Sequence, residues 1–213
     1  LFMKTIKIER FFRKLNDSIP KAETELCYRN TFELLIAVIL SAQATDISVN
    51  KVTPELFAAF PTPEEMHEAG SEKVLSYIRS IGLAPTKSKN IVRTCAQLVE
   101  NHAAQVPQNR EQLEALAGVG RKTANVILNT AFGHPVIAVD THIFRISNRT
   151  GLAPGNTVLQ VEENLMKAVP EKWKKDAHHL LILHGRYVCK SRKPDCEHCV
   201  IVQECEHPDK TVP

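Results

Sequence analysis

Glycine, aromatic residues and long apolar runs are all scarce in this chain. Eight of its 213 residues are glycine and 6% are aromatic, which excludes a collagen-like or glycine-rich low-complexity chain. The longest apolar run, Leu34 to Leu40, is about a third of the ~20 residues that a membrane span needs, so we expect no transmembrane helix. No basic and then apolar leader opens the sequence, which argues against secretion. Leu1 and Phe2 precede Met3, which we expect to be the natural start.

Alternation of apolar and polar residues, which is typical of a half-buried strand, is also missing. The short β-branched run Val136–Val139 has no partner run. Apolar residues instead recur at helical spacing along nearly the whole chain, and several of these stretches follow an N-cap pattern. Examples are Ile8, Phe11, Phe12 and Leu15 within residues 7–16, and the caps Asn30, Thr62 and Thr157. The sequence predicts an all-α fold of roughly ten helices joined by short turns, with a helix break at Gly70.

The excess positive charge lies in one part of the chain. The net charge is +3, and residues 115–150 hold one acidic residue, Asp140, against four basic ones, namely Arg121, Lys122, Arg145 and Arg149. Elsewhere the basic and acidic residues balance. A local excess of this kind is typical of a surface that binds a polyanion, although a solvated face of an ordinary enzyme has the same appearance.

Four of the six cysteines crowd together near the C-terminus. Cys27 and Cys95 are isolated, and we expect both to be small core residues. The others have the spacing Cys-x6-Cys-x2-Cys-x5-Cys and are Cys189, Cys196, Cys199 and Cys205. Without a secretory leader, thiols this close indicate a metal site rather than disulfides. The spacing suits zinc or an iron–sulfur cluster, and the single Cys-x2-Cys pair slightly favours the cluster. The neighbouring His198 and His207 are predicted to be surface residues.

Two helices joined by a glycine-containing turn are predicted for about residues 110–132. The turn is Ala117-Gly118-Val119-Gly120, and Arg121-Lys122-Thr123-Ala124 opens the second helix, whose predicted polar face carries Lys122, Asn125 and Asn129. Glycine permits a close backbone approach, and the free N–H groups at a helix start favour an anion such as a nucleic-acid phosphate. A tight turn without a ligand is the alternative.

Lys122 and Asp140 are candidate reactive groups. Lys122 lies in the first turn of its helix beside Arg121, and both surroundings favour the neutral amine. A neutral lysine is a nucleophile that forms Schiff bases with carbonyl carbons, whereas a protonated one would contact a phosphate, and the residues alone leave both open. Asp140 is an N-cap candidate, and a cap is also a rigid mount for a catalytic carboxylate. A nearby Asp140 would in turn favour the charged amine.

Several motifs occur in a characteristic order. The glycine hairpin with its lysine precedes Val139-Asp140-Thr141-His142, and the four-cysteine spacing follows. Together with Leu40-Ser41-Ala42-Gln43-Ala44-Thr45-Asp46, Ile81-Gly82-Leu83 and Leu183-His184-Gly185-Arg186-Tyr187, these motifs resemble the endonuclease III family of DNA repair glycosylases, within the helix-hairpin-helix superfamily. The resemblance covers most of the chain.

The resemblance implies an all-α fold of two lobes that flank a DNA-binding cleft. A six-helix barrel would span residues 24–134 and contain the helix-hairpin-helix at about 110–132, and an iron–sulfur domain would combine residues 1–23 and 135–213. The implied activity is base excision repair: removal of oxidised pyrimidines from damaged double-stranded DNA, with AP lyase cleavage by β-elimination through a lysine Schiff base. We expect a monomer without a membrane partner, in the cytoplasm or another reducing intracellular compartment.

The resemblance also implies roles for individual residues. Lys122 matches the nucleophile, Asp140 matches the essential carboxylate, and the four clustered cysteines match the ligands of a 4Fe-4S cluster. Gln43 and Leu83 match the residues that fill the gap left by a flipped-out base. The other expected DNA contacts are Gly118, Gly120, Arg121, Thr123 and His142, and the basic loop residues Lys190, Arg192 and Lys193.

Three other functions fit parts of this pattern. A DNA-binding module without activity would use the hairpin alone, and an electron carrier would use the cysteine cluster alone. A glycosylase for mispaired bases would share the fold, although Lys122 favours the bifunctional members over those that activate water. The preferred lesion among oxidised pyrimidines does not follow from the sequence.

Overall fold

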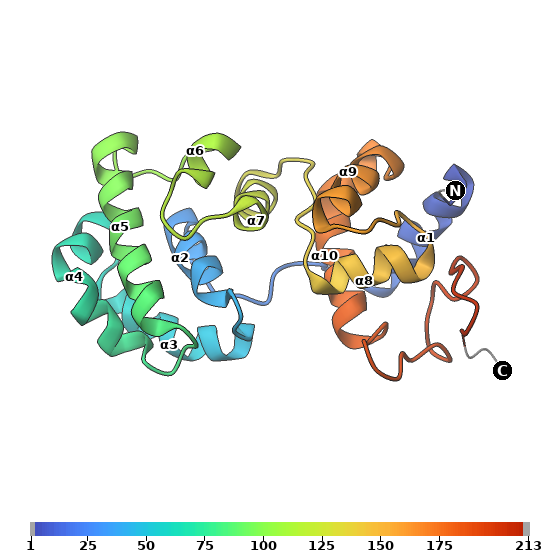
Figure 1. Cartoon of the computed structure of the whole chain (residues 1–213), viewed down its shortest axis with the longest axis horizontal. Coiled ribbons are helices and arrows are strands. Elements are labelled where there is room, and N and C mark those ends of the chain that lie inside the picture. Colours follow the sequence, from blue (N-terminus) through green and yellow to red (C-terminus); the bar gives the residue numbers. More distant parts are fainter. Residues whose placement is uncertain (1–2, 211–213) are drawn as a thin grey trace. The chain divides into compact units, whose positions relative to one another are not determined.

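The structure, a computed structural model, describes residues 3–210 (Figure 1). Leu1 and Phe2, which precede the expected start, lie outside the described residues. Within this range all regular secondary structure is helical, which confirms the predicted all-α class. The ten helices are α1 (Thr5–Ser18), α2 (Thr31–Ser41), α3 (Asp46–Ala59), α4 (Pro63–Ile78), α5 (Ala84–His102), α6 (Arg110–Glu114), α7 (Arg121–Phe132), α8 (Thr141–Thr150), α9 (Val158–Ala168) and α10 (Glu171–Tyr187).

The chain folds into two compact units. The central unit is Glu25–Phe132 and contains α2 to α7, whereas the terminal unit combines residues up to Thr24 with those from Gly133 onward and contains α1 and α8 to α10. That one unit is a six-helix barrel domain and the other an iron–sulfur domain stays a prediction. In the region from residue 3 to residue 210, no helix is both long enough and apolar enough to cross a membrane.

The central unit is built around α2 and α7. Every residue of α2 from Phe32 to Leu40 is buried, and the helix packs against α3, α5 and α7 (Figure 1). A helix that is apolar on all sides is stable only inside a core. The next helix of this core, α7, is buried from Ala124 to Asn129 because α2 and α6 both pack on it. The predicted polar face is therefore wrong beyond Lys122, since Asn125 and Asn129 are inside the core.

The terminal unit has its own apolar core. The predicted apolar face of α1 is confirmed, and it packs on α10, which in turn packs on α8. Phe12 stacks on Trp173 with ring centroids 6.1 Å apart, and the Trp173 indole N–H donates to Glu9 Oε2 at 2.9 Å. Such stacking joins the N-terminal helix to the C-terminal half of the chain although they are distant in sequence.

The predicted helix starts are confirmed at the level of single hydrogen bonds. Asn30 Oδ1 accepts from the Glu33 N–H at 2.9 Å, and Thr62 and Thr157 cap α4 and α9 in the same way. Gly70, with φ of 77°, interrupts α4 as predicted. An N-cap of this kind supplies an acceptor for a backbone N–H that has no partner within the helix.

Two features depart from the sequence-based expectations. Helix α3 is continuous although Pro54, a residue type that usually ends or kinks a helix, lies inside it. Cys95 is buried as expected, but Cys27 is exposed, because it lies in the segment before α2, where its backbone N–H donates to Asn50 Oδ1 at 2.9 Å.

Candidate functional site

The turn between α6 and α7 is held by side chains from α5. Thr94 Oγ1 donates to the Ala117 carbonyl at 2.7 Å, and the Gln97 side chain accepts from the Ala117 N–H at 2.9 Å while donating to the Ala115 carbonyl at 3.0 Å. These three bonds fix the backbone just before Gly118. Thr94 and Gln97 were not identified from the sequence, because nothing in their own stretch shows that α5 runs beside the turn.

The two glycines of the turn differ in their surroundings. Gly118 has φ of +77°, and a Cβ added there would lie 3.0 Å from Asn90 Nδ2. Left-handed backbone and close contact both require glycine at this position. An added Cβ at Gly120 would meet no atom within 4 Å. The structure itself therefore places no demand for glycine at Gly120, which leaves a close approach by a ligand as a reason for it.

Lys122 is presented at the start of a helix that is otherwise held in the core. Arg121 and Lys122 are exposed and Thr123 is half-buried, whereas the six residues after Thr123 are buried. An exposed amine is therefore attached to a backbone that the core immobilises. The N-terminal end of α7 also favours anionic groups, as expected for a phosphate contact.

Gln43 and Leu83 share an unusual backbone conformation. Their φ angles are 55° and 61°, in the left-handed region that side chains with a Cβ rarely adopt. Both residues are exposed, and Leu83 retains 56% of its accessible surface although it is a large apolar residue. Strained backbone with an exposed apolar side chain is typical of positions selected for binding rather than for packing.

In the terminal unit, Asp140 and His142 lie at the start of α8. Asp140 Oδ1 accepts from the Ile143 N–H at 2.8 Å, which confirms the predicted cap. His142 Nδ1 is 3.1 Å from an Arg145 guanidinium nitrogen, and Arg145 also donates to the Gly185 carbonyl at 2.7 Å and the Cys189 carbonyl at 3.1 Å. Arg145 thereby joins the start of α8 to the end of α10 and to the first of the four clustered cysteines.

Those four cysteines surround one cavity of about 220 Å³. All four are free thiols. Burial raises the pKa of the Cys199 thiol to about 11, and burial also raises the pKa of Cys205. Buried thiols beside one another ionise only when a cationic group compensates their charge, which is what a metal centre supplies.

Two side chains from outside the cysteine segment lie within hydrogen-bonding distance of its sulfur atoms. Arg149 Nη1 lies 3.5 Å from Cys189 Sγ, and His184 Nε2 lies 3.5 Å from Cys199 Sγ. Burial lowers the pKa of His184 to about 4, so its ring is neutral at pH 7. Neither contact was predicted. His207, expected at the surface, is half-buried and lines the same cavity, whereas His198 is exposed as expected.

Within the described residues, the side chains do not form a ready-made site for a single metal ion. Among residues 3–210, no three histidine, cysteine or acidic side chains are arranged to hold a single metal ion. Tetrahedral zinc with Zn–S bonds of about 2.3 Å would draw its sulfurs to roughly 3.8 Å from one another. Four thiols that line a shared cavity are nevertheless the residue types that bind zinc or an iron–sulfur cluster.

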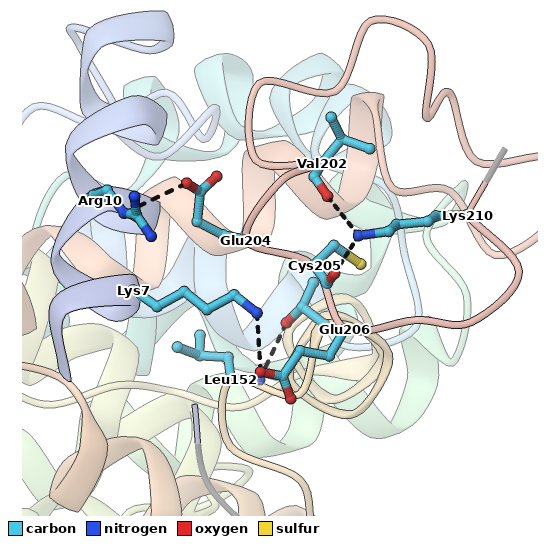
Figure 2. Close-up of polar contacts among 9 residues, drawn as sticks. Lys7, Arg10, Leu152, Val202, Glu204, Cys205, Glu206 and Lys210 are labelled. Carbon is cyan, nitrogen blue, oxygen red and sulfur yellow. Dashed lines mark hydrogen bonds and ion pairs between the residues drawn. The ribbon is translucent and has the colours of Figure 1, made fainter. Parts of the chain in front are cut away.

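The last ligand candidate, Cys205, is tied to the N-terminal helix. Figure 2 shows Lys7 and Arg10 of α1 reaching the carboxylates of Glu206 and Glu204, on either side of Cys205. Lys7 Nζ is 3.0 Å from Glu206 Oε1 and Lys14 Nζ is 3.0 Å from Glu204 Oε2, whose side chain is 3% exposed. On the opposite side, Lys210 donates to the Cys205 carbonyl at 2.8 Å (Figure 2).

The loop between the first two cysteines displays its basic side chains to solvent. Lys190, Arg192 and Lys193 are all exposed. Arg149 donates to the carbonyls of Lys190 at 2.7 Å and Ser191 at 3.3 Å, so the backbone is fixed from inside while the charges face outward. This arrangement suits contacts to phosphates.

The predicted site residues are thus divided between the two units. The central unit holds Lys122 and six of the expected DNA-contacting residues. These are Gln43, Leu83, Gly118, Gly120, Arg121 and Thr123. The terminal unit holds Asp140, His142, the cysteines and the basic loop. The functional roles of these residues stay predictions.

Comparisons with known proteins agree closely with one another. A family profile described as HhH-GPD superfamily base excision DNA repair protein matches residues 36–171. The chain is 57% identical to the endonuclease III of Haemophilus influenzae over 207 residues, which covers 97% of this chain and 98% of that protein. It is 55% identical to the endonuclease III of Escherichia coli over 208 residues, with coverage of 98% and 99%.

A solved structure gives the same result for the fold. It is a trapped covalent intermediate of endonuclease III with DNA, in an estranged-adenine complex. It matches this chain with a TM-score of 0.90 and 44% identity, over 96% of this chain and 97% of that one.

Alanine substitutions at the two turn glycines should separate folding from ligand approach. Gly118→Ala places a Cβ in left-handed backbone and against Asn90, so we expect a loss of about 1–2 kcal/mol in the free energy of unfolding. Gly120→Ala has open space, so its unfolding free energy should change by less than ~1 kcal/mol. If the turn contacts phosphate closely, Gly120→Ala should still weaken binding to duplex DNA about tenfold. Urea unfolding and fluorescence anisotropy measure the two quantities. Wild-type affinity in Gly120→Ala would contradict a close phosphate contact there.

Proposed function

Because this chain belongs to the endonuclease III family of base excision DNA repair proteins, we propose that Lys122 is its nucleophile and that Asp140 acts on the same deoxyribose. The protein is a bifunctional DNA glycosylase and AP lyase. The proposed substrates are oxidised pyrimidines and abasic sites in duplex DNA. The observation that carries the proposal is the exposed Lys122 side chain in the first turn of a helix whose following residues are buried.

The proposed reaction has two stages. The neutral Lys122 amine attacks C1′ of the damaged nucleotide, the C1′–N bond breaks, and the base leaves with that electron pair and a proton. The C1′–O4′ bond then breaks, O4′ takes its electron pair and the proton given up by Nζ, and the nitrogen lone pair forms an iminium between Nζ and C1′. Loss of a proton from C2′ breaks the C3′–O bond and releases the 3′-phosphate, and water finally hydrolyses the imine and regenerates the lysine.

Asp140 would supply negative charge as the base departs. The sugar of the damaged nucleotide carries positive charge at that moment. A carboxylate that is already fixed in place stabilises this charge without having to reorient. As a carboxylate, Asp140 can also accept a proton during the reaction. The cap bond to Ile143 orients the carboxyl group, so the structural and catalytic roles of this residue are compatible.

The damaged base must leave the duplex before Lys122 can reach the sugar. We propose that Gln43 and Leu83 enter the resulting gap, since both are exposed on strained loops. Phosphates would be contacted by Gly118, Gly120, Arg121 and Thr123 in the hairpin. The other proposed contacts come from the terminal unit and are His142, Lys190, Arg192 and Lys193.

The four-cysteine cavity is proposed to hold a 4Fe-4S cluster through Cys189, Cys196, Cys199 and Cys205. Four thiols around a shared cavity, with a neutral His184 and a cationic Arg149 directed at the sulfurs, suit this group. The bound cluster would supply structural cross-linking of the segment and compensate the thiolate charge. We further propose a monomer that works in a reducing intracellular compartment, where cysteines remain available as ligands.

Reductive trapping tests the identity of the nucleophile. In borohydride, the wild-type protein should become covalently attached to duplex DNA that carries thymine glycol or an abasic site. Lys122→Gln should form no adduct and should lose at least about a thousandfold in strand scission, because no imine can form. Its affinity for a stable abasic analogue serves as the control and should stay within about threefold. Binding without scission or trapping by the wild type would instead identify a DNA-binding module.

Substitution of Asp140 by asparagine separates its two roles. Asparagine is an equally good N-cap, so the thermal midpoint of Asp140→Asn should stay within about 2 °C of the wild type. The single-turnover rate of base excision should fall about a hundredfold, because the carboxylate charge is lost. Excision at the wild-type rate would leave Asp140 with a capping role alone.

The identity of the metal group can be read from the purified protein. We expect a broad absorbance band near ~400 nm, with about four iron and four sulfide per chain. Removal of the cluster, or Cys199→Ser, should make residues 189–205 sensitive to proteases, because the loop loses its cross-link. A colourless protein with one zinc per chain would overturn the assignment.

A further inference from the structure

One lysine outside the proposed site is buried without being part of the core. Lys87 is 5% exposed and lies in the first turn of α5. Its Nζ donates to the Leu40 carbonyl at 2.8 Å and to the Ala42 carbonyl at 2.6 Å. Burial lowers the pKa of Lys87, since removing an ammonium from water disfavours its charged form. Lysine is seldom buried unless its ammonium is paired, so burial of Lys87 points to a specific role for its two hydrogen bonds.

The two carbonyls lie at the C-terminal end of α2. They have no acceptor role within the helix, and the helix dipole makes this end negative, so a cation is favoured here. Helix α2 ends at Ser41, and Gln43 follows directly after Ala42. The ammonium of Lys87 therefore anchors the backbone from which the Gln43 side chain projects.

The backbone of Lys87 is hydrogen-bonded to Leu83. The Lys87 N–H donates to the Leu83 carbonyl at 3.0 Å in the first turn of α5. The two loops lie close together, because even a Cβ built at Gly82 would come within van der Waals distance, 3.7 Å, of the Gln43 carbonyl oxygen. One residue thus connects the two loops, and both of them carry left-handed backbone that their neighbours must hold in place.

We propose that Lys87 is a positioning residue that keeps the Gln43 and Leu83 loops at a fixed separation, so that both side chains enter the duplex together as the damaged nucleotide leaves. This inference rests on the proposed role of Gln43 and Leu83. Lys87 acts through these two residues on the opening of the duplex. It takes no part in the bond changes at the deoxyribose.

The test compares a paired substrate with one that is already open. Lys87→Met keeps an unbranched apolar side chain, one atom shorter than lysine, and removes both hydrogen bonds to the carbonyls. On a fully paired duplex with thymine glycol, single-turnover excision by this variant should be about tenfold slower than the wild type. On the same lesion in a short unpaired bubble, the loss should shrink to less than about threefold, because little stacking has to be disrupted.

Matched variants separate positioning from general loss of stability. Leu98→Ala removes a buried side chain three turns further along α5 and should affect both substrates equally. In a Gln43→Ala/Leu83→Ala background, Lys87→Met should cause no additional loss on the duplex, because the residues it positions are gone. If Lys87→Met does not fold, Lys87→Leu, which also lacks N–H donors, is measured in its place with the same expected results.

Each outcome has a distinct meaning. An equal loss on duplex and bubble, no loss at all, or a full additional loss in the double-alanine background would overturn the positioning role. A wild-type protein that leaves both substrates intact would instead overturn the proposed function, which the wild-type arm detects before any variant is compared.

Discussion

The placement of the Lys122 amine is the constraint on which the proposed chemistry depends. Attack on a sugar carbon requires a geometry in which an error of about 1 Å lowers the rate roughly a hundredfold. Lysine side chains are long and flexible, so the backbone that carries the amine must be immobile. Helix α7 meets this requirement because its next residues are buried against α2 and α6, and because Thr94 and Gln97 fix the turn before it.

In the terminal unit, too, candidate functional residues are held in place by hydrogen bonds and ion pairs. Asp140 is oriented by its own cap bond, and Arg145 connects the start of α8 to Gly185 and to Cys189. The cysteine segment has almost no regular secondary structure, so its shape depends on such long-range bonds and on the ion pairs with α1. A metal group bound by the four cysteines would add a further cross-link within this segment.

Local patterns predicted much of this architecture, and long-range contacts account for what they missed. The caps at Asn30, Thr62 and Thr157 follow from short motifs, and each is present. The family was predicted from the chain's resemblance to the endonuclease III family, because the characteristic order of motifs can be recognised in a single sequence. The burial of Asn125 and the contacts of His184 and Lys87 could not be predicted, because each depends on a helix that is distant in sequence. Cys27 was expected in the core but is exposed, because a residue type that is usually buried does not by itself determine the burial of one position.

The most direct test of the central claim is to locate the covalent bond in the protein itself. After borohydride reduction with abasic duplex DNA, protease digestion and mass spectrometry would identify the peptide that carries the sugar remnant. The account predicts a single modified residue, Lys122. Attachment at any other lysine, or at the chain's amino terminus, would contradict it.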